Sequence, residues 1–360
     1  MARVLMTADA VGGVWTYALE LARALVRHGF VTTLATMGPR PSADRLSSAA
    51  DIPGLEIIES DFRLEWMDDA WSDVERAGAW LLALEAQARP DIVHVNGYAH
   101  AALSWQAPAV AVAHSCVLSW AEAVGHPLDP TWTRRYHDAV VRGLHAAAWV
   151  VAPSAAMLAA LQRHYGALPR ASVVPNGRDK RQFRARPKEP FVFSAGRIWD
   201  RAKNIDALAA VAPRLSWPVV VAGDGDADGV AAHLGRLAEA DLATWLSRAS
   251  IFALPARYEP FGLLPLEAAL AGCALVLGDI PSLREIWGDA ADYVAPDDRD
   301  GLVGAIEELA ASRARRARRA AAARARAIEL APARMADAYV AVYRRAAAAR
   351  GIEQEMPCAS

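Results

Sequence analysis

The chain has 360 residues, and at roughly 100–200 residues per domain we expect two domains. Hydrophobic residues make up 54% and charged residues 22%, which is typical of a soluble globular protein. A formal net charge of −2 argues against a dedicated nucleic-acid binder. No apolar run approaches the ~20 residues that cross a membrane, so we expect no transmembrane segment.

The three cysteines, Cys116, Cys273 and Cys358, are scattered along the chain. They match neither a disulfide framework nor a metal site, which favours a reducing compartment, and we expect the cytoplasm. The N-terminal "MARVLMTADAVGG" has only a short apolar run. It therefore predicts a first strand rather than a signal peptide.

The first half of the chain alternates apolar stretches with helical ones. After "RVLMTAD", a helical pattern runs on to Gly29, where a helix C-cap glycine is expected. Further strands are predicted at "FVTTLATM", "LEIIES", "DIVHVNG", "AVAVAH", "AWVVAPS" and "SVVPNG". They are apolar on both faces, which is typical of parallel strands covered by helices on each side.

The second half repeats this alternation after the basic segment "GRDKRQFRARPKEP". Its predicted strands are "FVFSAGR", "PVVVAGDG", "SIFALPA", "CALVLGD" and "ADYVAP". We therefore predict an α/β fold with two doubly wound, Rossmann-like domains. Ligands of such sheets bind at the carboxyl ends of the strands, so the site would face a central cleft between the domains.

We place the N-terminal domain at residues 1–170, a linker at 171–190 and the C-terminal domain at 191–330. A last helix at 331–350 has one apolar, aromatic face and could cross back to the N-terminal domain. The Arg-Ala helix at 311–327 could form a peripheral contact with anionic lipid, or be a solvated helix in a chain of biased composition. We favour the solvated helix.

Two glycine-containing segments follow predicted strands. Gly12 and Gly13 precede a helix, where backbone N–H groups can approach a phosphate, although a simple tight turn has the same pattern. The stretch "GDGDADG" resembles the start of a calcium loop, but the position of the final carboxylate ligand is occupied by Gly235. We therefore expect a polar turn and no metal there.

Cations cluster after the strand "FVFSAGR". Arg197 ends this strand, and Lys203 follows six residues later, near the next helix. A guanidinium and an ammonium at one strand end suit a diphosphate, whereas Arg201 is expected to be solvated. Only three of the 39 basic residues are lysines, which adds weight to Lys203.

Two histidines end buried strands. His114 follows "PAVAVA", and its imidazole is either a satisfied core group or a hydrogen-bonding partner for a sugar hydroxyl. His94 in "DIVHVNG" has the same placement but no supporting motif.

The segment "RYEPFGLLPLEAALAGC" joins a strand end, a loop and a helix. Glu259 follows the strand "SIFALPA" and can meet a sugar beyond a diphosphate. Phe261, Gly262 and Leu263 form a turn at the helix start, where backbone N–H groups and the helix dipole favour a phosphate. Glu267, in the first turns of the helix, can accept two hydrogen bonds from a ribose diol.

These motifs carry a family resemblance over nearly the whole chain. "YEPFGLLPLEAALAGC" resembles the E-x7-E segment of retaining GT-B glycosyltransferases, particularly family 4, which includes the group 1 glycosyl transferases. "AGRIWDRAKN", "AVAHS" and "TADAVGGVWTYALELARAL" are similar to that family's Arg-Lys diphosphate motif, histidine strand and N-terminal glycine loop. The family often has a glycine-rich variant where this chain has Glu-Pro-Phe-Gly, and Pro260 stiffens the loop.

The resemblance implies a retaining, metal-independent hexosyltransferase that uses a UDP- or GDP-sugar and needs no other cofactor. His114 and Glu259 would be catalytic, Gly12, Gly13, Arg197, Lys203, Phe261, Gly262 and Leu263 would bind the diphosphate, Glu267 the ribose and Leu237 the base. The acceptor stays open among a glycan, a lipid-linked saccharide and a small metabolite. Alternatives are a catalytically inactive nucleotide-sugar-binding protein, or an epimerase or phosphorylase of similar fold.

Overall fold

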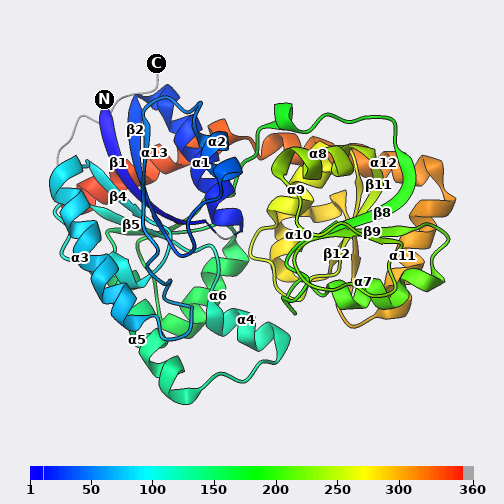
Figure 1. The fold of residues 1–360 in the computed structure, drawn as a ribbon, viewed down its shortest axis with the longest axis horizontal. Helices are drawn as coiled ribbons and strands as arrows, with labels where there is room; N and C mark the ends of the chain where they lie inside the picture. Colours follow the sequence, from blue (N-terminus) through cyan, green and yellow to red (C-terminus); the bar gives the residue numbers. More distant parts are fainter. Residues whose placement is uncertain (11, 352–360) are drawn as a thin grey trace. The chain divides into compact units, whose positions relative to one another are not determined.

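The computed structural model describes residues 1–10 and 12–351, which form two α/β domains, each built on a parallel sheet (Figure 1). Of these described residues, those within 1–119, 127–177 and 332–351 form the first domain, and 120–126 and 178–331 form the second. The predicted pair of doubly wound domains is therefore confirmed.

The first sheet has seven parallel strands in the order β3-β2-β1-β4-β5-β6-β7. The chain starts at its centre and winds outward in both directions, so the switch point lies between β1 and β4. The strands are β1 (Ala2–Asp9), β2 (Phe30–Met37), β3 (Leu55–Glu59), β4 (Ile92–Val95), β5 (Ala109–Val112), β6 (Trp149–Ala152) and β7 (Ala171–Val173).

Helices join these strands, as Figure 1 shows. They are α1 (Gly13–Leu25), α2 (Ala43–Ala49), α3 (Trp71–Ala88), α4 (Val117–Val124), α5 (Pro130–Ala146) and α6 (Ala155–Tyr165), with 3₁₀ turns η1 (Val26–His28) and η2 (Ala99–Ala102). Gly29 closes η1 with a φ of 72°, a left-handed conformation that glycine adopts without a steric penalty.

The last helix, α13 (Pro332–Ala349), belongs to the first domain and lies beside α1 (Figure 1). Its aromatic face is buried: Tyr339 and Tyr343 pack in one cluster with Tyr17 of α1 and Phe30 of β2. Burying such large side chains stabilises the fold by about 1.5–3 kcal/mol each. The C-terminal helix is therefore part of the core of the first domain.

The second sheet has six parallel strands in the order β10-β9-β8-β11-β12-β13. Its strands are β8 (Glu189–Ala195), β9 (Val219–Ala222), β10 (Ala232–His233), β11 (Ala249–Leu254), β12 (Ala274–Gly278) and β13 (Asp292–Val294). The helices are α7 (Ile205–Val211), α8 (Glu239–Arg248), α9 (Leu263–Leu270), α10 (Pro281–Trp287), α11 (Arg299–Ala311) and α12 (Arg313–Glu329), with 3₁₀ turns η3 (Lys180–Gln182), η4 (Ala212–Arg214) and η5 (Gly288–Ala290).

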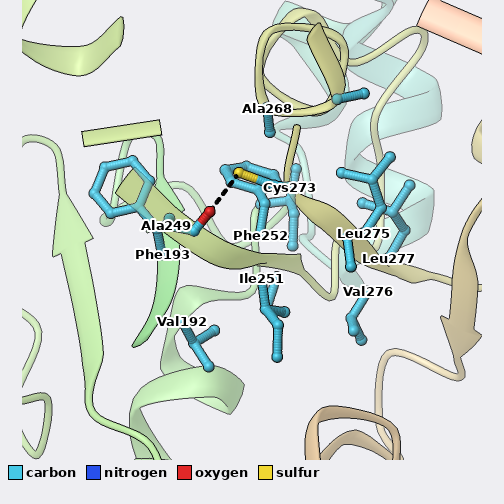
Figure 2. Close-up of a cluster of buried hydrophobic side chains, with 14 of the residues drawn as sticks. Val192, Phe193, Ala249, Ile251, Phe252, Ala268, Cys273, Leu275, Val276 and Leu277 are labelled. Carbon is cyan, nitrogen blue, oxygen red and sulfur yellow. Dashed lines mark hydrogen bonds between the residues drawn. The ribbon is translucent and has the colours of Figure 1, made fainter. Parts of the chain in front are cut away.

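The core of the second domain contains a buried thiol (Figure 2). Cys273 lies among Phe252, Leu275 and other apolar side chains, and its Sγ donates to the carbonyl oxygen of Ala249 over 3.3 Å. Burial raises the pKa of this thiol to about 11, so it is protonated at neutral pH. Nearby, Lys188 Nζ donates to the carbonyl oxygen of Ala271 over 2.8 Å, at the end of α9.

Within the described residues, no helix combines the length and the apolar character that a membrane crossing requires.

Candidate active site

The loop after β8 is shaped by close contact with the turn after β9. Gly223 has a φ of 146°, and a Cβ there would lie 1.7 Å from the carbonyl oxygen of Gly196, so no side chain fits. The backbone N–H of Ile198 donates to the carbonyl oxygen of Asp224 over 2.9 Å. The "GDGDADG" stretch therefore forms a turn that supports the loop carrying Arg197.

The same turn is closed by Gly235, whose carbonyl oxygen accepts from the backbone N–H of Gly223 over 2.8 Å. Gly235 therefore takes part through its backbone. Leu237 follows shortly after and packs, half-buried, against the core of the second domain.

Arg197 is held in place by an acidic and an aromatic neighbour. Its Nη2 lies 2.8 Å from Oδ2 of Asp200, a buried carboxylate. Its guanidinium lies 5.2 Å from the ring centre of Trp199, which is 61% exposed. A planar cation held in this way loses little further entropy when it binds an anion. Arg201, by contrast, is exposed.

Lys203 and Glu259 form an ion pair, with Nζ 2.6 Å from Oε2, and both side chains are largely buried. The contact joins the loop after β8 to the loop after β11, its neighbour in the sheet. Asn204, in a left-handed conformation with a φ of 55°, fixes this arrangement. Its amide donates to the carbonyl oxygens of Pro255 and Pro296, each over 2.8 Å.

The N-terminus of α9 follows the Glu-Pro-Phe-Gly turn. Gly262 is its N-cap with a φ of 92°, and within the described chain no side chain caps this end. Helix N-termini leave backbone N–H donors without an internal partner, and the helix dipole adds a partial positive charge. Phe261 is buried in the core, and Leu263 begins the helix. The turn therefore presents backbone donors rather than side chains.

Glu267, in the second turn of α9, is buried and faces a buried arginine. The Nε of Arg178 lies 2.9 Å from Oε1 of Glu267. A second carboxylate, Glu239 at the start of α8, also pairs with Arg178. The guanidinium lies 5.1 Å from the ring centre of Phe183. One buried cation therefore pairs with two carboxylates, that of Glu267, which is buried, and that of Glu239, which is half-exposed.

In the first domain, His114 and His94 share one acceptor. Nε2 of His114 lies 2.7 Å and Nε2 of His94 lies 3.1 Å from Oδ1 of Asn96. Tyr17 contacts the His114 ring edge-on, with ring centres 4.4 Å apart. Burial lowers the pKa of each histidine to about 3, so both are neutral at pH 7.

The glycine loop of the first domain precedes α1. Gly12 is the N-cap residue with a φ of 91°, a conformation strained for any other residue, and Gly13 is the first residue of the helix. The first N–H groups of a helix have no partner within the helix, so this end is the part of α1 at which an anion could bind.

Comparisons with known proteins agree over most of the chain. The model of Glycosyltransferase Family 4 matches residues 11–182, and that of Glycosyl transferases group 1 matches residues 189–312. The chain belongs to the family 4 glycosyltransferases. It is 29% identical to a glycogen synthase of Mycobacterium tuberculosis, over 88% of this chain and 86% of that protein. It is also 29% identical to a D-inositol 3-phosphate glycosyltransferase of Xylanimonas cellulosilytica, over 89% and 88%.

Solved structures show that the glycosyltransferase has the GT-B fold. Sucrose-phosphate synthase from Thermosynechococcus elongatus superposes with a TM-score of 0.81 at 17% identity, over 97% of this chain and 100% of that one. Anabaena HepE in complex with UDP and glucose superposes with a TM-score of 0.73 at 17% identity, over 96% and 100%.

In the second domain of the glycosyltransferase, the loops after the neighbouring strands β8 and β11 carry the predicted site residues Arg197, Lys203 and Glu259. Lys203 and Glu259 touch, and Glu267 lies on the helix that follows the Glu259 loop. Gly12, Gly13 and His114 belong to the first domain. Arg178 and Asn204 were not predicted as site residues from the sequence. Arg178 stands in a segment rich in arginine, so no compositional signal separates it from its neighbours.

The arginines of α12 are largely used within the glycosyltransferase. Arg319 Nη2 lies 2.6 Å from Oδ1 of Asp292, and Arg315 Nη1 lies 2.7 Å from Oε2 of Glu308. Arg324 and Arg326 donate to backbone carbonyl oxygens of other elements. These bonds satisfy helix ends and carboxylates of the same domain, so a structural role accounts for much of the basic helix.

Proposed function

We propose that this glycosyltransferase transfers a hexosyl group from a UDP- or GDP-sugar to an acceptor, with retention of the anomeric configuration and without an essential metal ion. The observation that carries the proposal is the contact between Lys203 and Glu259, which joins the cation loop after β8 to the glutamate loop after β11. Arg197 precedes Lys203 in the first of these loops, and Glu267 follows Glu259 in the helix after the second.

The chemistry requires charge compensation on the leaving group. As the bond from the anomeric carbon to the phosphate oxygen breaks, negative charge develops on the nucleoside diphosphate, and preorganised donors lower the barrier. Lys203 has three ammonium hydrogens, so it can keep its bond to Glu259 while it donates to a phosphate oxygen. Together with Arg197 it supplies the positive charge for which other enzymes use a metal ion.

The other proposed contacts with the nucleotide sugar follow from the place of each residue at a strand end or a helix start. The carboxylate of Glu267 would accept from the ribose diol, and Leu237 would border the base. Backbone N–H groups of Phe261, Gly262 and Leu263 would donate to the diphosphate, as would those of Gly12 and Gly13. Glu259 and His114 would act on the transferred sugar.

The comparisons guide the choice of donor and acceptor. Structures of Anabaena HepE contain UDP with glucose, or UDP-glucose, so UDP-glucose is the first donor to test. The names of the relatives point to different acceptors, among them glycogen and inositol 3-phosphate. We therefore keep the acceptor classes of a glycan, a lipid-linked saccharide and a small metabolite.

A donor screen followed by product analysis tests the proposal. Thermal unfolding with a panel of UDP- and GDP-sugars is expected to show stabilisation by one nucleotide class, about 2.7 kcal/mol at a hundredfold excess over Kd. Proton NMR of the product in EDTA should then show the donor's anomeric configuration. An inverted product would refute retention. Donor binding without turnover on any acceptor would indicate an inactive binding protein, and a changed sugar nucleotide without acceptor would indicate an epimerase.

A further inference from the structure

The hydrogen-bond network around His114 extends through the first domain to the C-terminal helix. His114 contacts Asn96, Asn96 contacts His94, and Nδ1 of His94 lies 2.8 Å from the hydroxyl oxygen of Tyr343 in α13. Tyr17 adds a contact of 3.2 Å between its hydroxyl oxygen and Nε2 of His94. Tyr17 of α1 and Tyr343 of α13 are thus linked through His94 of β4 to the amide of Asn96.

The orientation of the Asn96 amide follows from its other partner. Its Nδ2 lies 2.6 Å from the carbonyl oxygen of Thr7, and a carbonyl oxygen can only accept. The amide nitrogen must therefore face Thr7. The backbone N–H of Asn96 also donates to Oγ1 of Thr7 over 2.9 Å, which fixes the residue at two points. Consequently Oδ1, a pure acceptor, faces the two histidines.

The proton positions on both rings follow from this acceptor. Each Nε2 must carry a hydrogen to bond with Oδ1 of Asn96. The Nδ1 of a neutral ring is then an acceptor, and for His94 it accepts from the hydroxyl of Tyr343. For His114, Nδ1 has no hydrogen-bond partner among the described residues, and the side chain is partly exposed.

We propose that Asn96 is a positioning residue that fixes His114 as the neutral Nε2–H tautomer, so that the Nδ1 lone pair accepts a hydrogen bond from a hydroxyl of the transferred sugar. The sugar contact rests on the proposed function, whereas the tautomer does not. His94 and Tyr343 belong to the same network. The hydroxyl of Tyr343 orients the ring of His94, which is the second ring that bonds to the amide oxygen of Asn96.

The surroundings of His114 oppose an imidazolium ion. The charged or titratable groups that face its ring are His94 and the phenol of Tyr17, and no carboxylate pairs with it within the described residues. Burial, and then the electrostatic influence of His94, lower its pKa to about 3. His114 can therefore accept from a hydroxyl at neutral pH but cannot serve there as a charged general acid.

NMR of protein labelled with nitrogen-15 histidine tests the tautomer directly. Long-range proton–nitrogen correlations distinguish the protonated from the unprotonated ring nitrogen, and His114→Gln assigns the signals. His100 is an internal standard, because its Nε2 lies 2.9 Å from the carbonyl oxygen of Val74 and must carry a hydrogen. We expect His114 to show the pattern of His100 at pH 7. An Nδ1–H tautomer or an imidazolium ion would overturn the inference.

Asn96→Asp tests the control exerted by the amide. A carboxylate beside Nε2 favours the imidazolium ion, so the pKa of His114 should rise by about one unit or more. In a turnover assay with the donor that the screen identifies, the acid limb of the pH profile of kcat/KM should move upward by the same amount. His100→Gln, which removes a buried histidine bond outside the network, should change neither quantity.

The outcomes separate the two proposals. An unchanged His114 pKa in folded Asn96→Asp would refute the positioning role, and if that variant does not fold, the wild-type tautomer decides. An Nε2–H tautomer in a protein that transfers no sugar would leave the tautomer assignment intact and refute the proposed function. Turnover with an Nδ1–H tautomer would do the reverse.

Discussion

Arg178 and Glu267 form a buried ion pair, with the guanidinium Nε 2.9 Å from Oε1, although the two residues lie far apart in the sequence. The side chains are 2% and 7% exposed, so water screens this pair little. Arg178 is the first residue of segment 178–331 of the second domain, and Glu267, the predicted ribose ligand, lies in α9. The same guanidinium also pairs with Glu239. The contact with Arg178 therefore orients Glu267 before any ligand binds.

Removing this guanidinium should weaken both stability and nucleotide binding. Arg178→Met removes the cation that faces the buried carboxylate of Glu267, at a cost of about 3–5 kcal/mol. Urea unfolding and calorimetry with UDP and GDP measure the two effects. Arg181→Met is the control, because Arg181 is in the same segment and pairs with Asp179 near the surface. Equal losses in the two variants would contradict the role of the buried pair.

Substitutions of the three basic residues in the loop after β8, Arg197, Arg201 and Lys203, should differ sharply in their effect on turnover. Arg197→Ala and Lys203→Ala should each lower kcat/KM, with a loss of about 2–4 kcal/mol of transition-state stabilisation. Each variant lacks a positive charge that, as proposed, contacts the leaving group. Arg201→Ala, which changes an exposed side chain, should be nearly silent. Steady-state kinetics with the identified donor decides. If Arg201→Ala is as damaging as Lys203→Ala, the assignment of the cation pair is wrong.

The two glutamates should separate binding from chemistry. Glu267→Ala should weaken binding of the nucleoside diphosphate, whereas Glu259→Ala and His114→Ala should bind it almost normally and turn over slowly. Contacts that strengthen only in the transition state raise the rate of the chemical step without raising ground-state affinity. Calorimetry beside a rate assay tests all three variants. The reverse pattern for the glutamates, or full activity of His114→Ala, would refute these roles.

Turnover should not depend on added metal. Under the proposed function, Arg197 and Lys203 compensate the charge of the diphosphate, so dialysis against EDTA should leave kcat unchanged. Re-addition of magnesium or manganese should have little effect. A strict requirement for either ion after dialysis would show that these cations do not suffice to compensate the leaving group.

The buried histidines should make folding sensitive to mild acid. The pKa of His94 is about 3 in the folded state and about 6.5 when the chain is unfolded, so the unfolded state binds more protons below pH 6.5. Stability is therefore complete above this pH and falls as the pH drops toward 3, by about 2 kcal/mol between pH 6.5 and 5 for this residue. Urea unfolding at the two pH values measures the loss. His94→Gln should reduce the difference, and an unchanged difference would contradict a neutral, buried His94.

Local segments of sequence predicted much of the second-domain site. Glu259 and Glu267 share one strand–loop–helix segment, and Arg197 and Lys203 share another, so strand ends and spacing suffice to place them. Arg178 could not be predicted in this way, because only the fold brings it to α9.

Long-range contacts also explain two features that the sequence alone did not account for. Gly223 is required because the carbonyl oxygen of Gly196 approaches it closely, which no local pattern reveals. His94 has a defined set of partners, but one of them, Tyr343, comes from the far end of the chain. Hydrogen bonds between distant segments depend on tertiary packing, and hydrophobic periodicity does not encode them.

Among the residues that the structure describes, each domain encloses one buried cysteine, Cys116 in the first and Cys273 in the second. A thiol enclosed in this way reacts with an alkylating reagent only when the surrounding core opens, because the reagent needs access and a thiolate. The two cysteines therefore act as built-in reporters of domain opening. Timed alkylation followed by mass spectrometry of the two peptides would show whether the domains unfold together or one before the other, without any engineered label.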